Sequence, residues 1–274
     1  MATREKEIAH FDRLDDELGD AENVDFTSNM YTEQVKVDVD LGTVYDADGE
    51  PVEWDEDAES RIFESVRLNL NGEVYDVTSK FINFLNTYEK GIEYPEQLIV
   101  DFRDEIRGQD YSTARLEFVL EQVSNLSEDG ETQEDTEITV VAKEKDKGNT
   151  NRVSKINDSV QSLSEGDDQF SVRQNGRYDF VLIQDEDGIL DRIHSEVILP
   201  GDEEEVVEES ARSLRNMNVQ EAGTRDLDSD FYLVDIAEAG NFHSDRADRI
   251  DFNVETSEEG SVRAWTVTER QLEA

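Results

Sequence analysis

The excess of acidic residues constrains this chain more than any other feature of its sequence. Asp and Glu number 70 against 26 Lys and Arg, which gives a net charge of −44. The acids are spread evenly, with 15 in residues 1–50, 14 in residues 101–150 and 14 in residues 201–250. Self-repulsion of this size destabilises a compact state at low ionic strength, whereas at about 1 M salt the Debye length falls to roughly 3 Å. The charge therefore predicts either a disordered chain or a folded one adapted to concentrated salt.

The apolar residues favour the folded alternative. Low hydropathy with high net charge is typical of disorder, but here the apolar residues keep a strong periodicity, and Phe, Tyr and Trp together number 22. Arg dominates the basic residues, because only 8 of the 26 are Lys. In composition the chain resembles proteins of haloarchaea and their viruses. We therefore expect a salt-adapted protein, with an acidic mesophilic protein as the alternative.

The same composition excludes several classes of protein. Affinity for a nucleic-acid backbone depends on Lys and Arg, so we expect no direct binding of that backbone. No stretch approaches the roughly 20 apolar residues that span a bilayer, and no charged-then-apolar leader opens the sequence. We expect no membrane span and synthesis in the cytoplasm, with a virion as one final location. Cys is absent, which excludes disulfides and Cys-based metal sites or nucleophiles.

Alternation of apolar and polar residues predicts strands that are buried on one face. The pattern recurs along both halves of the chain, and several of its segments end at Asp-Gly or Asn-Gly turns. The predicted strands lie near residues 35–41, 52–54, 138–142, 170–172, 178–183, 189–199, 231–234, 250–254 and 265–267.

The clearest hairpin surrounds Asn71-Gly72. This pair suits a type I′ turn, because both central residues of that turn need a positive φ. A two-residue loop pairs Leu70 with Glu73, Leu68 with Tyr75 and Val66 with Val77. Two of these three pairs join apolar residues on one face, as the pleat of a strand requires.

Apolar residues three and four positions apart predict a few helices. A helix after Thr78 or Ser79 ends at Gly91, and a second begins near Pro95 and ends at Gly108. Residues 112–126 fit a strand or a helix, and Ser112 or Thr113 as a cap favours the helix. Residues 202–216 predict a helix with Glu in its first turn and Arg in its last.

A further helix is predicted over residues 4–19. Ile8, Phe11, Leu14 and Leu18 form its narrow apolar face, and its other faces are nearly all charged. A stripe this narrow covers a small patch and cannot hold a core of its own. We therefore expect these four residues to contact a neighbouring subunit, with docking on the chain's own domain as the alternative.

Together these patterns predict an α+β, β-dominated fold. We expect hairpin-rich antiparallel sheets in sandwich-like lobes, with a few helices and the N-terminal helix. The polar stretch 143–152 is the predicted boundary between lobes. The expected divisions are an N-terminal helix and arm (1–29), a mixed α/β lobe (30–150) and a β-rich lobe with one acidic helix (151–274).

No residue stands out as catalytic, cofactor-binding or metal-binding. The acidic turns at Asp46–Gly49 and Asp185–Gly188 fail the calcium-loop pattern, since loop position one would be Val44 or Ile183. Of the three histidines, only His243 has a nearby carboxylate in a predicted loop, and an exposed loop histidine has the same appearance. Phosphate-binding loops and the G-x-S-x-G hydrolase motif are missing. We expect no cofactor.

Two classes of function remain. The first is a non-enzymatic structural subunit of a halophilic assembly, held by other protein subunits in a homo- or hetero-oligomer. Its most specific form is a virion component, of capsid or tail type, of a haloarchaeal virus. The alternative is a halophilic enzyme or small-ligand-binding protein of a family without short motifs, which one deep, partly apolar pocket would indicate.

Overall fold

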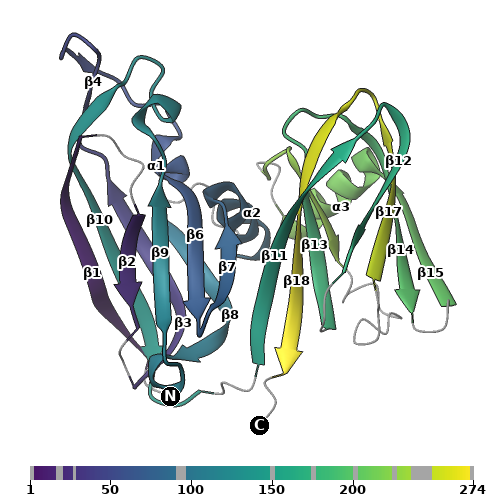
Figure 1. The fold of residues 1–274 in the computed structure, drawn as a ribbon, viewed down its shortest axis with the longest axis horizontal. Coiled ribbons are helices and arrows are strands. Elements are labelled where there is room, and N and C mark those ends of the chain that lie inside the picture. Colours follow the sequence, from purple (N-terminus) through teal and green to yellow (C-terminus); the bar gives the residue numbers. More distant parts are fainter. Residues whose placement is uncertain are drawn as a thin grey trace. The chain divides into compact units, whose positions relative to one another are not determined.

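The computed structural model describes residues 3–16, 21–26, 29–90, 97–148, 152–173, 177–199, 203–223, 227–235 and 249–271. The chain divides into two compact units, shown as a ribbon in Figure 1. The N-terminal unit holds residues 1–86 and 92–150, and the C-terminal unit holds residues 87–91 and 151–274.

The N-terminal unit contains two antiparallel sheets. In the first, the strand order is β1-β10-β3-β8, and β10 also pairs with β4, which pairs with β5. In the second, the order is β2-β9-β6-β7. The strands of the first sheet are β1 (Thr3–Asp16), β3 (Tyr31–Asp40), β4 (Thr43–Tyr45), β5 (Pro51–Val52), β8 (Gln97–Arg107) and β10 (Thr132–Lys145). Those of the second are β2 (Ala21–Asp25), β6 (Phe63–Leu70), β7 (Glu73–Val77) and β9 (Ala114–Leu120).

Short helices connect these strands. They are α1 (Ala58–Arg61), α2 (Ser79–Lys90) and the 3-10 turns η1 (Gly108–Asp110) and η2 (Val123–Asn125). Ser79 fixes the start of α2 to β6, because its Oγ donates to the Phe63 carbonyl at 2.6 Å. Thr78 Oγ1 accepts a hydrogen bond from the Phe81 N–H at 3.1 Å, which caps the helix.

The core of the N-terminal unit follows from alternation along its strands. Buried residues alternate with more exposed ones in β9 and along β10, so each sheet turns one face inward. Phe63 and Phe118 pack within the second sheet with ring centroids 5.0 Å apart. In the first sheet the inward positions include Val35, Val37 and Val140, all of them buried.

The C-terminal unit also contains two antiparallel sheets, each of four strands. Their orders are β11-β18-β13-β16 and β12-β17-β14-β15. The first consists of β11 (Arg152–Leu163), β18 (Gly260–Gln271), β13 (Arg177–Gln184) and β16 (Phe231–Asp235). The second consists of β12 (Gly166–Val172), β17 (Arg249–Thr256), β14 (Leu190–Leu199) and β15 (Glu203–Ser210), which is followed directly by α3 (Ala211–Ala222).

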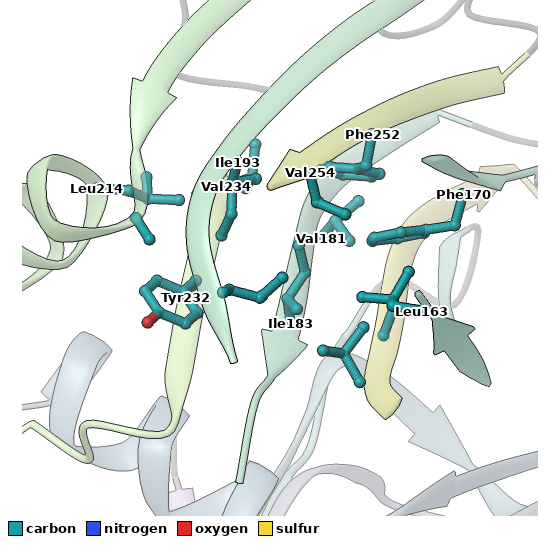
Figure 2. Close-up of a cluster of buried hydrophobic side chains, with 14 of the residues drawn as sticks. Leu163, Phe170, Val181, Ile183, Ile193, Leu214, Tyr232, Val234, Phe252 and Val254 are labelled. Atoms are coloured by element: carbon teal, nitrogen blue, oxygen red, sulfur yellow. The ribbon is translucent and has the colours of Figure 1, made fainter. Parts of the chain in front are cut away.

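The core of the C-terminal unit joins residues from both of its sheets and from α3, as Figure 2 shows. Phe170 and Phe252 are register partners on β12 and β17, and their rings stack with centroids 4.9 Å apart. Val181 and Ile183 enter the same cluster from the other sheet, and Leu214 enters it from α3. The cluster therefore closes a β-sandwich with one helix packed against it.

Helix α3 also satisfies the backbone at the edge of β16. The Asn218 side chain is buried and donates to the Leu233 carbonyl at 3.0 Å, while its Oδ1 accepts from the Leu233 N–H at 3.0 Å. Arg215 donates to the Ser229 carbonyl and to the Tyr232 hydroxyl, and its guanidinium lies 5.1 Å from the Tyr232 ring centroid. Burial raises the pKa of Tyr232.

The two units have the same topology. Counting eight strands in chain order in each unit, one sheet has the order 1-8-3-6 and the other 2-7-4-5, with a helix between the fifth and sixth strands. In the N-terminal unit β4, β5 and α1 are an insertion between the third and fourth of these strands. Eight antiparallel strands in two sheets connected this way form a jelly roll. The chain thus consists of two jelly rolls in tandem, although its sequence shows no repeat of fixed period.

The prediction of a β-dominated, antiparallel, sandwich-like fold is confirmed, but the N-terminal helix is wrong. Residues 3–16 form β1, which pairs with β10. The register of β1 shifts between Glu7 and Ala9 and again between Phe11 and Leu14. Each shift inserts an extra residue, so positions three apart return to one face of the strand and imitate a helical spacing.

Three further helix predictions are also wrong. Residues 97–107 form β8, and residues 114–120 form β9 followed by η2, where a helix was favoured over 112–126. The acidic segment expected as one helix over 202–216 is divided into strand β15 and helix α3. In β8 the residues Leu98, Ile99 and Val100 are all buried, so this strand lacks the alternation that identifies a half-buried one.

The hairpin at Asn71-Gly72 is confirmed. Asn71 has φ 54° and Gly72 has φ 92°, as a type I′ turn requires. The register pairs Leu70 with Glu73, Leu68 with Tyr75 and Val66 with Val77. Asn71 Oδ1 also accepts hydrogen bonds from the N–H groups of Ser112 and Thr113, so the turn is fixed to the start of β9.

Candidate functional site

Within the described residues, three acidic side chains are buried, and each has hydrogen-bond donors. Glu144 accepts from Arg4, and Asp251 accepts from Ser171 at 2.6 Å and from Arg249 at 2.8 Å. Asp185 is 2% exposed and accepts from the N–H groups of Ile189 and Leu190, both at 2.9 Å. These hydrogen bonds offset the cost of burying a carboxylate. Among the described residues, the charge excess therefore lies at the surface.

The two acidic turns that resemble calcium loops have structural roles. Asp46 Oδ1 accepts from the N–H groups of Asp48 and Glu50, both at 2.9 Å, which closes the turn between β4 and β5. Asp185 closes the turn between β13 and β14 in the same manner. Across the part of the chain that the structure describes, no group of three His, Asp or Glu is arranged to hold a metal ion.

The histidines are far apart in the sequence, and the two in the described residues lie on different strands. His10 lies on β1, exposed, with its Nδ1 2.9 Å from Thr139 Oγ1. His194 lies on β14, with its Nε2 3.1 Å from Glu196 Oε1. His243, the one with a candidate carboxylate neighbour in the sequence, lies outside the described residues.

A depression of about 550 Å³ lies on the outer face of the sheet β12-β17-β14. Asn253 is the register partner of both Gln169 and His194, and Glu255 is the partner of both Asp167 and Arg192. These rows of side chains project from three strands that are distant in the sequence. The depression is lined by Asp167, Asp168, Gln169, Arg192, His194, Asn253, Val254 and Glu255.

The chemistry of this depression is polar. Glu196 Oε1 accepts from Asn253 Nδ2 at 3.2 Å and lies next to His194, while Arg192 Nη1 is 3.9 Å from Glu255 Oε2. The N–H groups of Ser164 and Gln169 hold the pKa of the Asp168 carboxyl below its usual range. Val254 is the single apolar residue of the lining. The site can hold an ion or a small polar molecule, but it lacks the apolar walls of a typical ligand pocket.

The sequence could not indicate this depression, because its residues come from three separate segments of the chain, 167–169, 192–194 and 253–255. The sequence does show that polar residues alternate with apolar ones along each strand, as at Asp167, Gln169 and Ser171. The same pattern is expected of any strand whose outer face contacts solvent, so it does not indicate a binding site. Only the strand order β12-β17-β14 brings them together.

The residues predicted to contact a neighbouring subunit lie on and after β1. Ile8 and Phe11 are half-buried on this strand, and Leu14 is a register partner of Thr136. Leu18 lies outside the described residues. The strand pairs with β10 of its own unit, and contact of these residues with a second subunit stays a prediction.

A cluster of lysines lies on the sheet that contains β1. Lys145 Nζ is 2.9 Å from Glu33 Oε2 and 3.1 Å from Glu105 Oε1, and Lys143 Nζ is 3.5 Å from Glu33. The hydrogen bond from Lys145 and the charges of both lysines lower the pKa of Glu33. Lys36 forms an ion pair with Glu5 of β1 at 2.6 Å. These pairs connect strands β1, β3, β8 and β10 across one sheet.

The helices found in the described residues are all too short or too polar to cross a membrane. Each unit has the jelly-roll fold, which viral capsid domains, lectins and cupins share. No protein-family model matches the chain, and no curated protein matches its sequence.

Comparison with solved structures shows which jelly-roll proteins the chain resembles along its length. The major capsid protein P2 from Bacteriophage PM2 superposes with a TM-score of 0.72 at 11% identity, over 99% of this chain and 98% of that one. The STIV MCP gives a TM-score of 0.74 at 10% identity, over 98% and 97% of the two chains. The Faustovirus major capsid protein gives 0.62 at 8% identity, over 100% and 91%. The chain has the fold of these viral major capsid proteins along its whole length.

Proposed function

We propose that the chain is a structural subunit of a virus shell, a major capsid protein without enzymatic activity. The observation that supports this most strongly is the agreement in architecture over at least 97% of both chains with the capsid proteins of PM2 and STIV. Both jelly rolls are matched, so the resemblance is more extensive than a single shared domain. Its partners are further copies of itself and other virion proteins, and it makes no direct contact with a nucleic-acid backbone.

The physical properties of the fold suit a shell. In an antiparallel β-sandwich each strand is hydrogen-bonded to one or two neighbouring strands, and the two sheets pack face to face around a common core. This arrangement makes each unit rigid. In the N-terminal unit the first strand, β1, pairs with the eighth, β10. In the C-terminal unit β11 pairs with β18 in the same way. In each unit the first strand is therefore hydrogen-bonded to the last strand, which stabilises the unit.

We further propose that the shell belongs to a halophilic system, with a haloarchaeal virus as its source. The support is the net charge of −44, together with the burial of only three acidic side chains among the described residues. Copies with this charge repel each other at low ionic strength, and at about 1 M salt this repulsion acts only over roughly 3 Å. Assembly of such subunits is therefore expected to need concentrated salt.

Rate-zonal sedimentation of the purified chain tests the structural role. In roughly 3 M NaCl the chain should form large particles that electron microscopy shows as closed shells or regular sheets. A chain that stays monomeric from about 0.1 to 4 M NaCl, with or without the other proteins of its virus, would contradict the proposal.

A small-ligand-binding protein is the second candidate, and the depression around His194 and Asn253 is the observation that favours it. Ligand binding there predicts that His194→Ala and Asn253→Ala each abolish binding of a small polar molecule without changing assembly. The structural role alone predicts that the parent chain binds no such molecule in this depression and that both variants assemble like the parent chain.

A further inference from the structure

Each sheet of one jelly roll has an equivalent in the other, so the outer faces of equivalent sheets can be compared. By strand position, β12, β17 and β14, which carry the polar depression, correspond to β2, β9 and β6 of the N-terminal unit. In both sets, rows of register partners cross all three strands. Differences between the two faces therefore come from their side chains rather than from their topology.

Ion pairs occupy the outer face of the N-terminal set. Arg115 Nε lies 2.7 Å from Asp25 Oδ1, and Arg67 lies 3.0 Å from Asp76 and 3.1 Å from Glu117. Arg67 and Glu117 are register partners on β6 and β9, and Arg115 and Asp25 are partners on β9 and β2. These two arginines thus contact carboxylates of their own unit directly.

On the C-terminal set the facing charges are farther apart. Arg192 Nη1 is 3.9 Å from Glu255 Oε2. Next to this pair, Gln169, Asn253 and His194 form one row of register partners across the three strands. Neighbouring strands lie about 4.8 Å apart, so the row extends over about 10 Å. It presents two amides and an imidazole to the depression of about 550 Å³.

Hydrogen bonds within the unit hold several of these side chains in place. Glu196 Oε1 accepts from Asn253 Nδ2 at 3.2 Å and lies 3.1 Å from His194 Nε2, so it contacts two members of the row. The two carboxylate oxygens of Asp168 accept from the N–H groups of Ser164 and Gln169, both at 2.7 Å. Side chains held in this way lose less conformational freedom when a ligand binds.

The lining excludes several classes of ligand. Asp167, Asp168 and Glu255 repel an anion, and Val254 is the single residue of the lining that suits an apolar molecule. Within the residues that the structure describes, no group of three His, Asp or Glu is arranged to hold a metal ion. A neutral or cationic polar molecule remains, and about 550 Å³ lies within the roughly 300–1,000 Å³ of small-molecule sites.

Hydrogen-bonding capacity favours a neutral molecule over a cation. The carboxylates of Asp168 and Glu196 already accept hydrogen bonds from the protein, whereas the amides of Gln169 and Asn253 offer both N–H donors and a carbonyl acceptor. A hydroxyl group also donates and accepts, so an amide can bind it in either direction. In about 1 M salt the attraction of a cation acts over only roughly 3 Å, while hydrogen bonds at contact persist.

We propose that this depression binds a neutral saccharide, whose hydroxyl groups are hydrogen-bonded by Gln169, Asn253 and His194. A saccharide carries several hydroxyls on a small rigid ring, and a row of about 10 Å can contact two linked rings. The inference rests on the second candidate of the proposed function, that a small polar molecule binds here, and it names the class of that molecule. It does not depend on the assembly of the chain into a shell.

Saturation-transfer difference NMR of the full chain in about 3 M NaCl tests the class of ligand. The probes are the neutral saccharides glucose, galactose, mannose, maltose and lactose, with spermidine as the cation and citrate as the anion. At least one neutral saccharide should give a saturable signal that the two charged probes do not displace. The absence of a signal from every one of these saccharides would overturn the proposal.

Variants assign the signal to the row. Gln169→Ala and Asn253→Ala should each weaken saccharide affinity at least tenfold, with the circular dichroism spectrum unchanged, because each removes an amide that contacts the ligand. The matched control is Asn23→Ala, at an exposed position of β2 in the equivalent sheet, which should bind like the parent. Equal affinities in all four chains would contradict the assignment.

The charged probes separate this inference from the candidate on which it rests. Spermidine or citrate bound in the depression, without any saccharide, would overturn the neutral class and leave a small-ligand site standing. No binding of any probe would contradict both. Sedimentation of the same chains in roughly 3 M NaCl measures assembly separately.

Discussion

Arg4 and Glu144 lie directly opposite each other on the first and last strands of the N-terminal jelly roll, and Arg4 Nη2 is 2.7 Å from Glu144 Oε2. The two residues are 140 positions apart in the chain. The Glu144 side chain is 1% exposed, whereas that of Arg4 is 55% exposed. The N-terminal strand β1 is thus held to β10 by an ion pair between Arg4 and the buried Glu144 carboxylate.

Removal of this guanidinium should destabilise the N-terminal unit. Arg4→Met leaves a buried carboxylate without its partner, and because Arg4 is half-exposed we expect a loss of roughly 1–2 kcal/mol rather than the 3–5 kcal/mol of a fully buried pair. Urea unfolding in about 3 M NaCl measures the change. The double variant Arg4→Met/Glu144→Met should recover most of it, and an additive double variant would show that the two residues are not coupled.

The Asn71-Gly72 turn provides a test of backbone conformation. Gly72→Val should cost on the order of 1–3 kcal/mol in urea unfolding, because a β-branched residue resists the φ of 92° that Gly72 adopts. Gly72→Asn is the matched control, since Asn tolerates positive φ and should cost much less. Equal losses for Val and Asn would show that φ is not the cause.

The ion pairs of Glu33 predict an acid-sensitive contribution to stability. Lys145 and Lys143 lower the pKa of Glu33 in the folded chain, so the folded state holds this proton less tightly than the unfolded state does. The contribution is therefore complete above the unfolded-state pKa of a glutamate, about 4.3, and is lost as the pH falls through the lower folded-state value.

The matching measurement is the thermal midpoint of the parent chain and of Glu33→Gln between about pH 7 and pH 3. The thermal midpoint of the parent should exceed that of the variant near pH 7, and this difference should shrink as the pH approaches 3. The change in the difference should be larger at lower salt, where screening is weaker. A constant difference between the two chains across this range would contradict the assignment.

The charge of −44 predicts a strong dependence of stability on salt. The thermal midpoint in about 0.1 M NaCl should lie well below that in roughly 3 M NaCl, because self-repulsion is unscreened at the lower concentration. Sucrose at matched osmolality is the control, since it does not screen charge and should restore little of the loss. An equal or higher midpoint at low salt would refute the halophilic interpretation.

Local patterns in the sequence were sufficient where neighbouring residues decide the structure. The hairpin at Asn71-Gly72 was predictable to its register because turn geometry and alternation agree there. The start of α2 was predictable from Thr78 and Ser79, whose hydroxyls are used in the structure. The hairpin and the Thr78 cap use contacts between residues that are close in the sequence, whereas the Ser79 hydroxyl bonds to Phe63, 16 positions away.

Long-range pairing decided the elements that the sequence misassigned. Strand β1 has a helical apolar spacing, but β10 offers it a long partner, and register shifts reconcile the spacing with a sheet. Strand β15 is rich in Glu, a residue that strands disfavour, and pairing with β14 overrides that preference. The depression around Asn253 depends in the same way on three strands whose order no local pattern reveals.

Cryo-electron microscopy of the particles that sediment in roughly 3 M NaCl tests the central claim most directly. A capsid subunit predicts a closed shell whose repeating density is fitted by copies of the two tandem jelly rolls, with this chain as its most abundant protein by mass spectrometry. Particles whose walls are built from another protein, or a chain that remains a single soluble molecule while its virus assembles, would contradict that account.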